Sequence, residues 1–132
     1  MIIKNYIKTI VHTIQSGNNK KEGDKMKIKK YSDNHYVIEY KNDVYFSSYN
    51  SIVARIKNCC IFGKEEIFLG FDWDYSQTTL KNLYNFLEDF STIRLENYKN
   101  NTLSYELSRQ KNKKEFLQKL IDSKIIKTKV EL

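Results

Sequence analysis

Histidine is the side chain that most often transfers protons near neutral pH, and the chain has two, His12 and His35. The sequence pattern places His12 on the polar side of an expected helix and His35 at the start of an expected strand. We therefore predict structural or solvent-exposed roles for both. The histidines and cysteines lack the CxxC and HxxxH spacings that hold zinc. The sequence predicts no metal ion and no cofactor.

Four carboxylates lie close together in the sequence: Glu65, Glu66, Asp72 and Asp74. Paired carboxylates bind Mg²⁺ or act as acid and base, so a hydrolase using Asp72 and Asp74 is one hypothesis. The spacing favours structural roles instead. Neighbouring residues of a strand point to opposite faces, and the two Asp residues directly precede an expected helix, where negative charge is stabilising.

The two cysteines, Cys59 and Cys60, are adjacent. A nucleophilic cysteine needs a helix N-terminus or a histidine nearby to lower its pKa, and the neighbouring sequence supplies neither. On an expected strand the two thiols would point to opposite faces and could not easily bridge each other. We predict inert packing for at least one of them, and a reducing cytoplasm as the location of the protein.

The elements that must position these groups follow from the spacing of the apolar residues. Apolar residues recur every three or four positions from Ile3 to Ile14, and Gly17 can end a helix there. Residues 18–25 form an expected exposed, mobile loop. Alternating apolar residues and Asn- or Asp-containing turns then predict a meander of strands near 26–30, 36–40, 44–47, 52–56 and 67–69. A helix over 50–57 is the alternative to the fourth strand.

The clearest helix of the sequence spans about 76–90, because the Ser76 hydroxyl can accept a hydrogen bond from an unpaired amide of the first turn. Its predicted buried stripe consists of Leu80, Leu83, Tyr84, Leu87 and Phe90, and its opposite side of Lys81, Asn82, Asn85 and Glu88. A shorter helix with Phe116, Leu117, Leu120 and Ile121 on its apolar face, and a strand over 125–130, are expected to follow. This order predicts an α+β fold: an antiparallel sheet of about four to five strands with the long helix packed on it, plus N-terminal and C-terminal helices.

A chain of 132 residues with 40% hydrophobic residues is expected to fold as a single domain. Within residues 1–132 we expect a helix and loop over 1–25, a sheet-and-helix core over 26–90, and a C-terminal extension over 91–132. No apolar run approaches the roughly 20 residues needed to cross a bilayer, so no membrane partner is predicted. The oligomeric state is not readable from the sequence.

The net charge of +7 is unevenly distributed, with +6 in residues 1–31, −4 in residues 32–98 and +5 in residues 99–132. Two basic ends around an acidic middle predict surfaces of opposite sign, although lysine also serves simply to keep a surface soluble. The candidate partner-binding residues in the basic ends are Lys20, Lys21, Lys27, Lys29, Lys30, Arg109, Lys111, Lys113 and Lys114. Tyrosines between the lysines could stack nucleic-acid bases, which makes a small basic DNA- or RNA-binding regulator the alternative function. The tyrosines concerned are Tyr31, Tyr36, Tyr40, Tyr45 and Tyr49.

Residues from about Val44 to Leu87 resemble a pattern carried by small proteins of Firmicutes phages and plasmids. In one-letter code the pattern is F-x-S-Y-x-S-x-x-A, then L-G, then W-D-Y-S-x-T-T-x-K-x-L-x-x-F-L. Its residues are Phe46, Ser48, Tyr49, Ser51, Ala54, Trp73, Asp74, Tyr75, Ser76, Thr78, Thr79 and Lys81. We expect mainly structural roles for them, with Trp73 and Tyr75 packing the helix start against the sheet and the hydroxyls satisfying its first amides.

The same pattern is similar to one in some staphylococcal type II-A anti-CRISPR proteins, which block Cas9. The resemblance implies a phage or mobile-element protein without catalysis of its own, whose partner is Cas9 or the Cas9–guide RNA complex. Both flanks of the chain lie outside the pattern. The resemblance therefore implies a shared fold more directly than a shared target.

Overall fold

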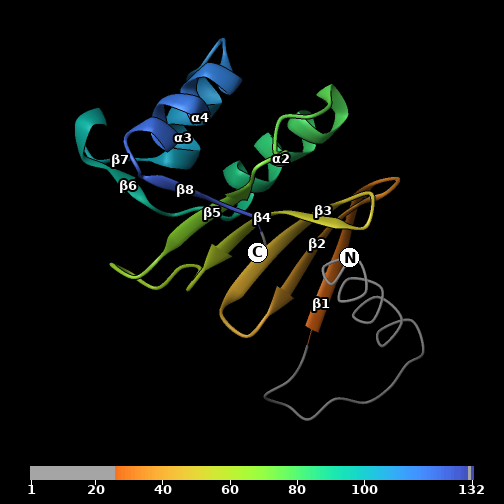
Figure 1. The fold of residues 1–132 in the computed structure, drawn as a ribbon. Coiled ribbons are helices and arrows are strands. Elements are labelled where there is room, and N and C mark those ends of the chain that lie inside the picture. The colour runs from red at the N-terminus through yellow and green to blue at the C-terminus, as the bar shows by residue number, and fades with distance from the viewer. Residues whose placement is uncertain (1–25, 131) are drawn as a thin grey trace.

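The computed structural model describes residues 26–130 and 132 of the chain, and Figure 1 shows their arrangement. Several predictions concern residues outside this range: the helix over 3–14, the loop over 18–25, His12, Lys20 and Lys21. The strands are β1 (Met26–Ser32), β2 (His35–Tyr40), β3 (Asp43–Ser48), β4 (Ser51–Lys57), β5 (Glu66–Gly70), β6 (Arg94–Leu95), β7 (Asn101–Thr102) and β8 (Ile126–Lys129). The helices are α2 (Gln77–Phe90), α3 (Leu103–Arg109) and α4 (Lys113–Asp122), with a 3₁₀ turn at Glu96–Tyr98.

Six strands form one sheet in the order β1-β2-β3-β4-β5-β8, and the short β6 and β7 pair separately. The first five strands are an antiparallel meander, whereas β8 adds to β5 in parallel. Asn34, Lys41 and Asn50 in the tight turns between the first four strands have positive φ angles of 68°, 56° and 67°. Such turns match the twist of a hairpin, and asparagine tolerates this backbone region well.

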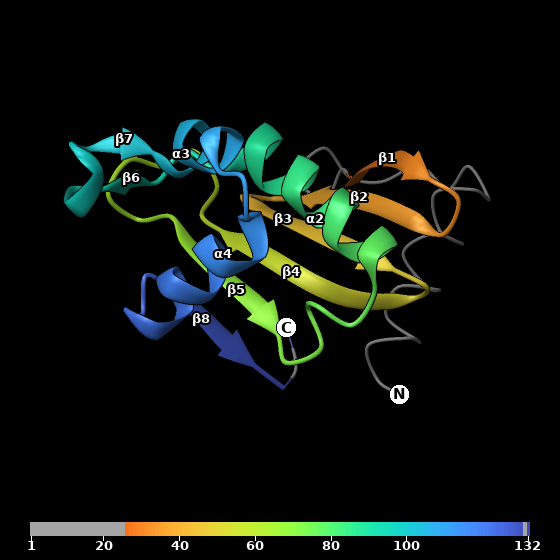
Figure 2. The same ribbon diagram turned by 90° about the horizontal axis from the view of Figure 1, so that it is seen from above.

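The described helices α2, α3 and α4 cover the same face of the sheet, as Figures 1 and 2 show from two directions. Alternation along the strands therefore divides the sheet side chains into two groups. The large core, with Val37, Phe46 and Ile67, lies between the sheet and the helices. A smaller cluster of Ile38, Tyr45 and Ile52 lies on the other face, with Met26, Ile28 and Leu132 packed against it.

The α+β class predicted from the sequence is confirmed, with two differences in the sheet. The sheet has six strands rather than four to five, and its last strand is parallel to its neighbour. Residues 51–57 form a strand, so the alternative helix there is wrong. The short helix α3 was not expected. None of the helices among the described residues is long and apolar enough to cross a membrane.

The predicted face of α2 needs correction at one turn. Asn82 was expected on the exposed side, but it is buried, and its side-chain amide donates to the Thr78 carbonyl oxygen at 2.9 Å. Phe86, which was not in the predicted stripe, is fully buried and stacks on Phe46 with ring centroids 5.6 Å apart. The buried face of α2 is therefore wider than the three- and four-residue spacing of the predicted apolar stripe indicated.

Candidate functional site

The helix start at Ser76 forms as the sequence predicts. The Ser76 hydroxyl oxygen accepts from the Thr79 backbone amide at 3.1 Å, which satisfies one of the unpaired donors of the first turn. The Thr79 hydroxyl is buried and lies 2.9 Å from the hydroxyl of Ser48, at the end of β3. Two motif residues far apart in the sequence thus join the helix start to the sheet.

The Trp-Asp-Tyr part of the motif divides between the core and the surface. Trp73 is only 4% exposed and belongs to the main core, as expected. Tyr75 is 64% exposed, so the prediction that it packs the helix start against the sheet is wrong. The Asp74 carboxylate forms an ion pair with Lys114 of α4 at 3.5 Å, and the first turn of α2 contains no acidic residue. Asp74 therefore links the segment before α2 to α4.

The other motif residues mostly build the scaffold. Phe46 and Ala54 are buried cross-strand partners in the core, and Ser51 pairs with Ser48 where β4 begins. Tyr49 is about half exposed in the hairpin turn, with its ring edge against the His35 ring at 5.2 Å between centroids. Thr78 and Lys81 are exposed on α2.

His35 is completely buried between the β2–β3 end of the sheet and the ring of Phe46, on which it stacks. Its Nδ1 lies 3.0 Å from the Ser32 hydroxyl and 2.8 Å from the Asp33 carbonyl oxygen, while its Nε2 has no partner in the described structure. The ring is part of the packed interior of the protein.

The candidate partner-binding residues that the structure describes fall into two separate groups. Lys27, Lys29 and Lys30 lie on β1, at one edge of the sheet, whereas Arg109, Lys111, Lys113 and Lys114 lie around the α3–α4 turn, and α4 packs near β8 at the other edge. Several are engaged within the protein: Lys30 with Asp33, Lys113 with Glu88, Lys114 with Asp74 and Arg109 with Glu106. They do not form one continuous basic surface.

The tyrosines do not form one stacking face either. Tyr31 packs against the main core on the helix side, where its hydroxyl donates to Asp89 at 2.6 Å; burial and this bond raise its pKa. Tyr45 is buried on the opposite face, with the Arg55 guanidinium over its ring. The predicted aromatic platform for bases is therefore split between the two faces of the sheet.

A second region, which the sequence did not indicate as a site, is the connection between β4 and β5. We call residues 58–65 the β4–β5 loop. The Glu65 carboxylate makes most of the hydrogen bonds that hold this loop. It accepts hydrogen bonds from the backbone amides of Cys60, Thr92 and Ile93 at 3.0–3.2 Å. The hydroxyls of Ser91 and Thr92 donate to the same carboxylate at 3.0 and 2.8 Å. Glu65 thus fastens the loop to the segment that leaves α2.

Cys59 and Cys60 lie in this loop and not on a strand, so the expectation that they point to opposite faces is wrong. Their sulfur atoms are 3.5 Å apart, and Cys60 has a positive φ of 66°. The half-buried Cys59 thiol donates to the Phe90 carbonyl oxygen at 3.3 Å, and burial together with the neighbouring Cys60 thiol raises its pKa to about 12. Cys59 is therefore a structural thiol, whereas Cys60 is exposed.

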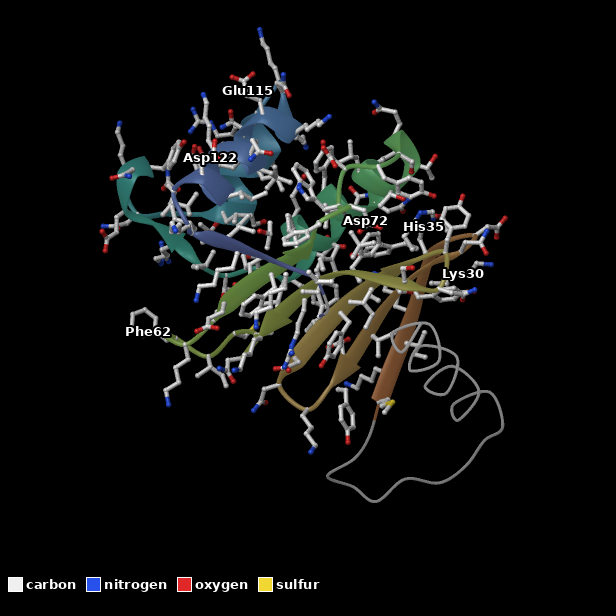
Figure 3. All side chains as sticks on the ribbon, in the orientation of Figure 1. Lys30, His35, Phe62, Asp72, Glu115 and Asp122 are labelled. Carbon is white, nitrogen blue, oxygen red and sulfur yellow. The ribbon has the colours of Figure 1, made fainter. Side chains whose placement is uncertain are left out.

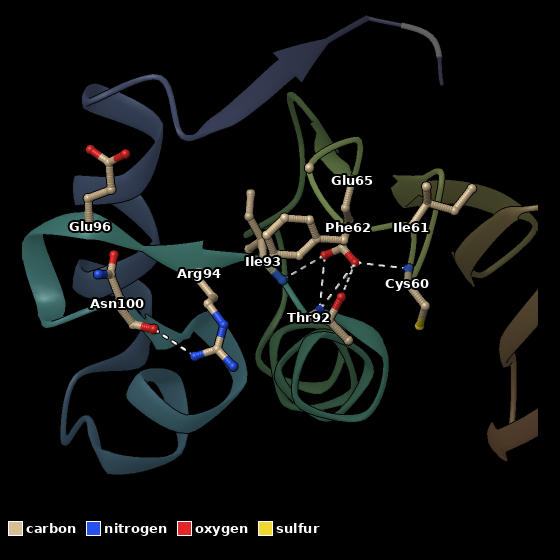
Figure 4. A pocket seen from close by; sticks show the side chains of 10 residues that line it. Cys60, Ile61, Phe62, Glu65, Thr92, Ile93, Arg94, Glu96 and Asn100 are labelled. Atoms are coloured by element: carbon tan, nitrogen blue, oxygen red, sulfur yellow. Dashed lines mark hydrogen bonds between the residues drawn. The ribbon is translucent and has the colours of Figure 1, made fainter.

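An open groove of about 910 Å³ lies beside the loop, between it and residues 92–100, as Figure 4 shows. Ile61, Phe62 and Ile93 give it an apolar part, and Arg94 and Glu96 give it charges of both signs. The Arg94 guanidinium donates to the Asn100 carbonyl oxygen at 2.9 Å. The only sequence signal for this groove is the apolar pair Ile61-Phe62 directly before Gly63, in a segment that must turn.

Among the described residues, no group of three or more His, Cys, Asp or Glu side chains is placed to hold a metal ion. Glu66 pairs with Lys127 at 3.9 Å, and Asp72 is exposed at the end of β5. Figure 3 shows Asp72 apart from the groove residue Phe62. The four carboxylates that are close in sequence therefore point to different parts of the molecule.

Comparison with known proteins gives one family. No curated protein and no solved structure matches the chain. A family model described as a family of unknown function, DUF8033, matches residues 17–116, which include both the helix start and the β4–β5 loop. Because this match spans more than half of the chain, the protein belongs to that family.

Proposed function

We propose that this protein is a non-catalytic inhibitor of a type II CRISPR nuclease, which it blocks by binding Cas9 or the Cas9–guide RNA complex. Two observations support the proposal. The motif over Phe46–Ala54 and Trp73–Lys81 resembles that of some anti-CRISPR proteins. Among the described residues, most side chains that could do chemistry have partners within the scaffold, whereas Asp72 and Cys60 are exposed.

The internal contacts of the carboxylates support the non-catalytic part of the proposal. The Glu65 carboxylate is surrounded by five N–H and O–H donor groups, Asp74 is paired with Lys114, and Glu66 is paired with Lys127. A carboxylate held in this way contributes to stability and orientation and is poorly placed to exchange protons with a substrate. We therefore infer that the protein acts by binding a partner on its outer surface.

The experiment mixes purified protein with Cas9 and guide RNA and follows cleavage of a target DNA. We expect inhibition that needs inhibitor in amounts comparable to the nuclease, together with comigration of the two proteins on size exclusion. An Asp72→Ala/Asp74→Ala double variant should inhibit as well as the wild type once its fold is verified. Undiminished cleavage and no comigration across Cas9 orthologues would remove the proposal.

The same samples separate binding to Cas9 from binding to nucleic acid. Affinity that rests on phosphate contacts falls steeply as salt concentration rises. Gel shifts of the protein with the guide RNA alone and the target DNA alone, at low and high salt, test this. A strong salt-sensitive shift without Cas9 would favour the DNA- or RNA-binding alternative.

A further inference from the structure

Phe62 is the most exposed large apolar side chain among the described residues, with 94% of its surface accessible to solvent. It lies in the β4–β5 loop, projects away from the rest of the molecule in Figure 3, and lines the groove together with Ile93, as Figure 4 shows. When a partner covers an exposed aromatic ring next to a groove, burial of the ring contributes a large share of the binding free energy, because aromatic anchors dominate the energetics of interfaces.

The loop that presents Phe62 is held in place by hydrogen bonds at both ends. The Asn58 backbone amide donates to the Asp43 carboxylate at 3.1 Å, and the Asn58 side chain donates to the Lys64 carbonyl oxygen at 3.3 Å. Within the loop the Ile61 amide donates to the Asn58 carbonyl and the Lys64 amide to the Ile61 carbonyl. Together with the Glu65 contacts, these bonds order the loop before any partner arrives, which reduces the entropy lost on binding.

Gly63 permits the turn that exposes Phe62. Its φ of +77° lies in the left-handed region, and nothing lies within 4 Å of the position that a β-carbon would occupy. The requirement for glycine therefore comes from the backbone conformation rather than from crowding.

The charges around the groove indicate the chemistry of its occupant. Arg94 forms part of the groove wall, and Lys64 and Lys99 are the chain neighbours of the lining residues Glu65 and Asn100. The negative charge of Glu65 is directed inward to backbone amides, whereas Glu96 is exposed on the groove lining. A phosphate backbone carries a negative charge at every nucleotide, so Glu96 would repel it, whereas a protein segment can place a single acidic side chain at Arg94, whose guanidinium points away from Glu96 in Figure 4, and an apolar one against Phe62.

We propose that Phe62, Ile61, Ile93 and Arg94 form a docking surface for a protein segment that carries an acidic side chain next to an apolar one. The proposal rests on the proposed function in so far as the protein acts by binding another protein, and it names the surface. The basic residues predicted from the sequence are not the centre of this surface.

The first experiment does not require the partner to be known. A displayed library of short random peptides is selected on the wild-type protein, and the peptides obtained are measured by fluorescence polarisation. We expect enrichment of peptides that combine Asp or Glu with Leu, Ile or Phe. Phe62→Ala should weaken them about 30-fold, a loss of about 2 kcal/mol at 1.4 kcal/mol per tenfold. Arg94→Ala should weaken the acidic peptides about tenfold, as the loss of one interfacial ion pair does.

The matched control is Phe71→Ala. Phe71 is an exposed phenylalanine directly after β5, at the opposite end of that strand from the β4–β5 loop. Affinity should change less than about twofold in this variant, because rim and remote residues contribute little. Thermal unfolding of all three variants verifies the fold. The inference would be overturned if no peptides were enriched, or if the peptides bound Phe62→Ala as tightly as the wild type. It would also be overturned if the enriched peptides lacked acidic residues and bound Arg94→Ala as tightly as the wild type.

The second experiment applies the same variants to Cas9. If the wild type inhibits Cas9 and Phe62→Ala inhibits equally, the docking surface is wrong while the proposed function stands. If the wild type inhibits no Cas9 but the peptide selection gives the expected result, the proposed function is wrong while the docking surface stands. If single-stranded RNA bound the wild type but not Phe62→Ala, the occupant of the groove would be a nucleic acid and the inference would be overturned.

Discussion

The helix start at Ser76 and the β4–β5 loop both satisfy backbone amides with a side-chain oxygen, but they use this device in opposite ways. At the helix start the Ser76 hydroxyl caps α2 while the neighbouring Trp73 is buried in the core. In the loop the Glu65 carboxylate caps three amides while Phe62 is turned out to solvent.

The difference separates a region that builds the fold from a region that offers a surface. An aromatic ring inside the core stabilises the protein in proportion to the surface it buries, whereas an exposed ring contributes almost nothing until a partner covers it. The exposed aromatic side chain of the hydrogen-bonded loop is therefore the centre of the docking surface that we propose. The residues at the helix start build the fold, and the β4–β5 loop carries the docking surface that we propose.

The largest effect is expected from Trp73→Ala, which removes the aromatic ring of the helix-start region. Loss of this ring from the core should lower the free energy of unfolding by about 3–5 kcal/mol, as truncation of a buried Trp does. Urea unfolding followed by circular dichroism measures it. Tyr75→Ala, two residues away and exposed, should change the stability by less than about 0.5 kcal/mol. Similar losses in both variants would contradict the division between buried and exposed aromatic residues.

Glu65→Ala should have the next largest effect, because it leaves three backbone amides and two hydroxyls without their acceptor. We expect a loss of about 2–3 kcal/mol, typical of removing a charged hydrogen-bond partner. The amides of Thr92 and Ile93 should also exchange their hydrogen faster. Glu66→Ala, which removes only a 3.9 Å surface ion pair with Lys127, is the control. It should cost less than about 1 kcal/mol, and an equal loss would show that Glu65 does not organise the loop.

Ser76→Ala should have the smallest effect, about 1 kcal/mol, which is the usual contribution of a helix N-cap. Its buried neighbour Thr79 keeps a second partner in Ser48, so the core contact survives. Thr78→Ala, on the exposed side of the same helix turn, should be nearly neutral. Urea unfolding of the pair checks the difference. A neutral Ser76→Ala would mean that Thr79 and Ser48 alone hold the helix start.

Local patterns predicted most of the fold. Alternating apolar residues located the five strands of the meander, and Ser76 located the start of α2. The errors arose where a distant segment decides burial. Asn82 lies beside Ser32 of β1, whose hydroxyl donates to its side-chain oxygen at 3.5 Å, a contact that no helical period reveals. The parallel pairing of β8 with β5 also joins segments far apart in the chain.

The candidate groove was not predictable by the same reasoning. Its lining comes from residues 60–65 and 92–100, and the Glu65 hydrogen bonds hold these segments together. In the sequence Glu65 is one of several acidic residues, and its role depends on which amides face it. The adjacent cysteines were misplaced for a related reason, because the strand ends before them and the chain turns at Asn58 and Cys60.

The amino-acid sequence by itself determined the α+β class, the hairpins and the capped start of α2, because these depend on side chains within a few residues of one another. The tertiary structure alone decided which polar groups are buried and which carboxylates become structural. It also decided that the Phe62 ring is exposed to solvent beside a groove. These properties depend on contacts between segments distant in the chain, which hydrophobic periodicity does not encode.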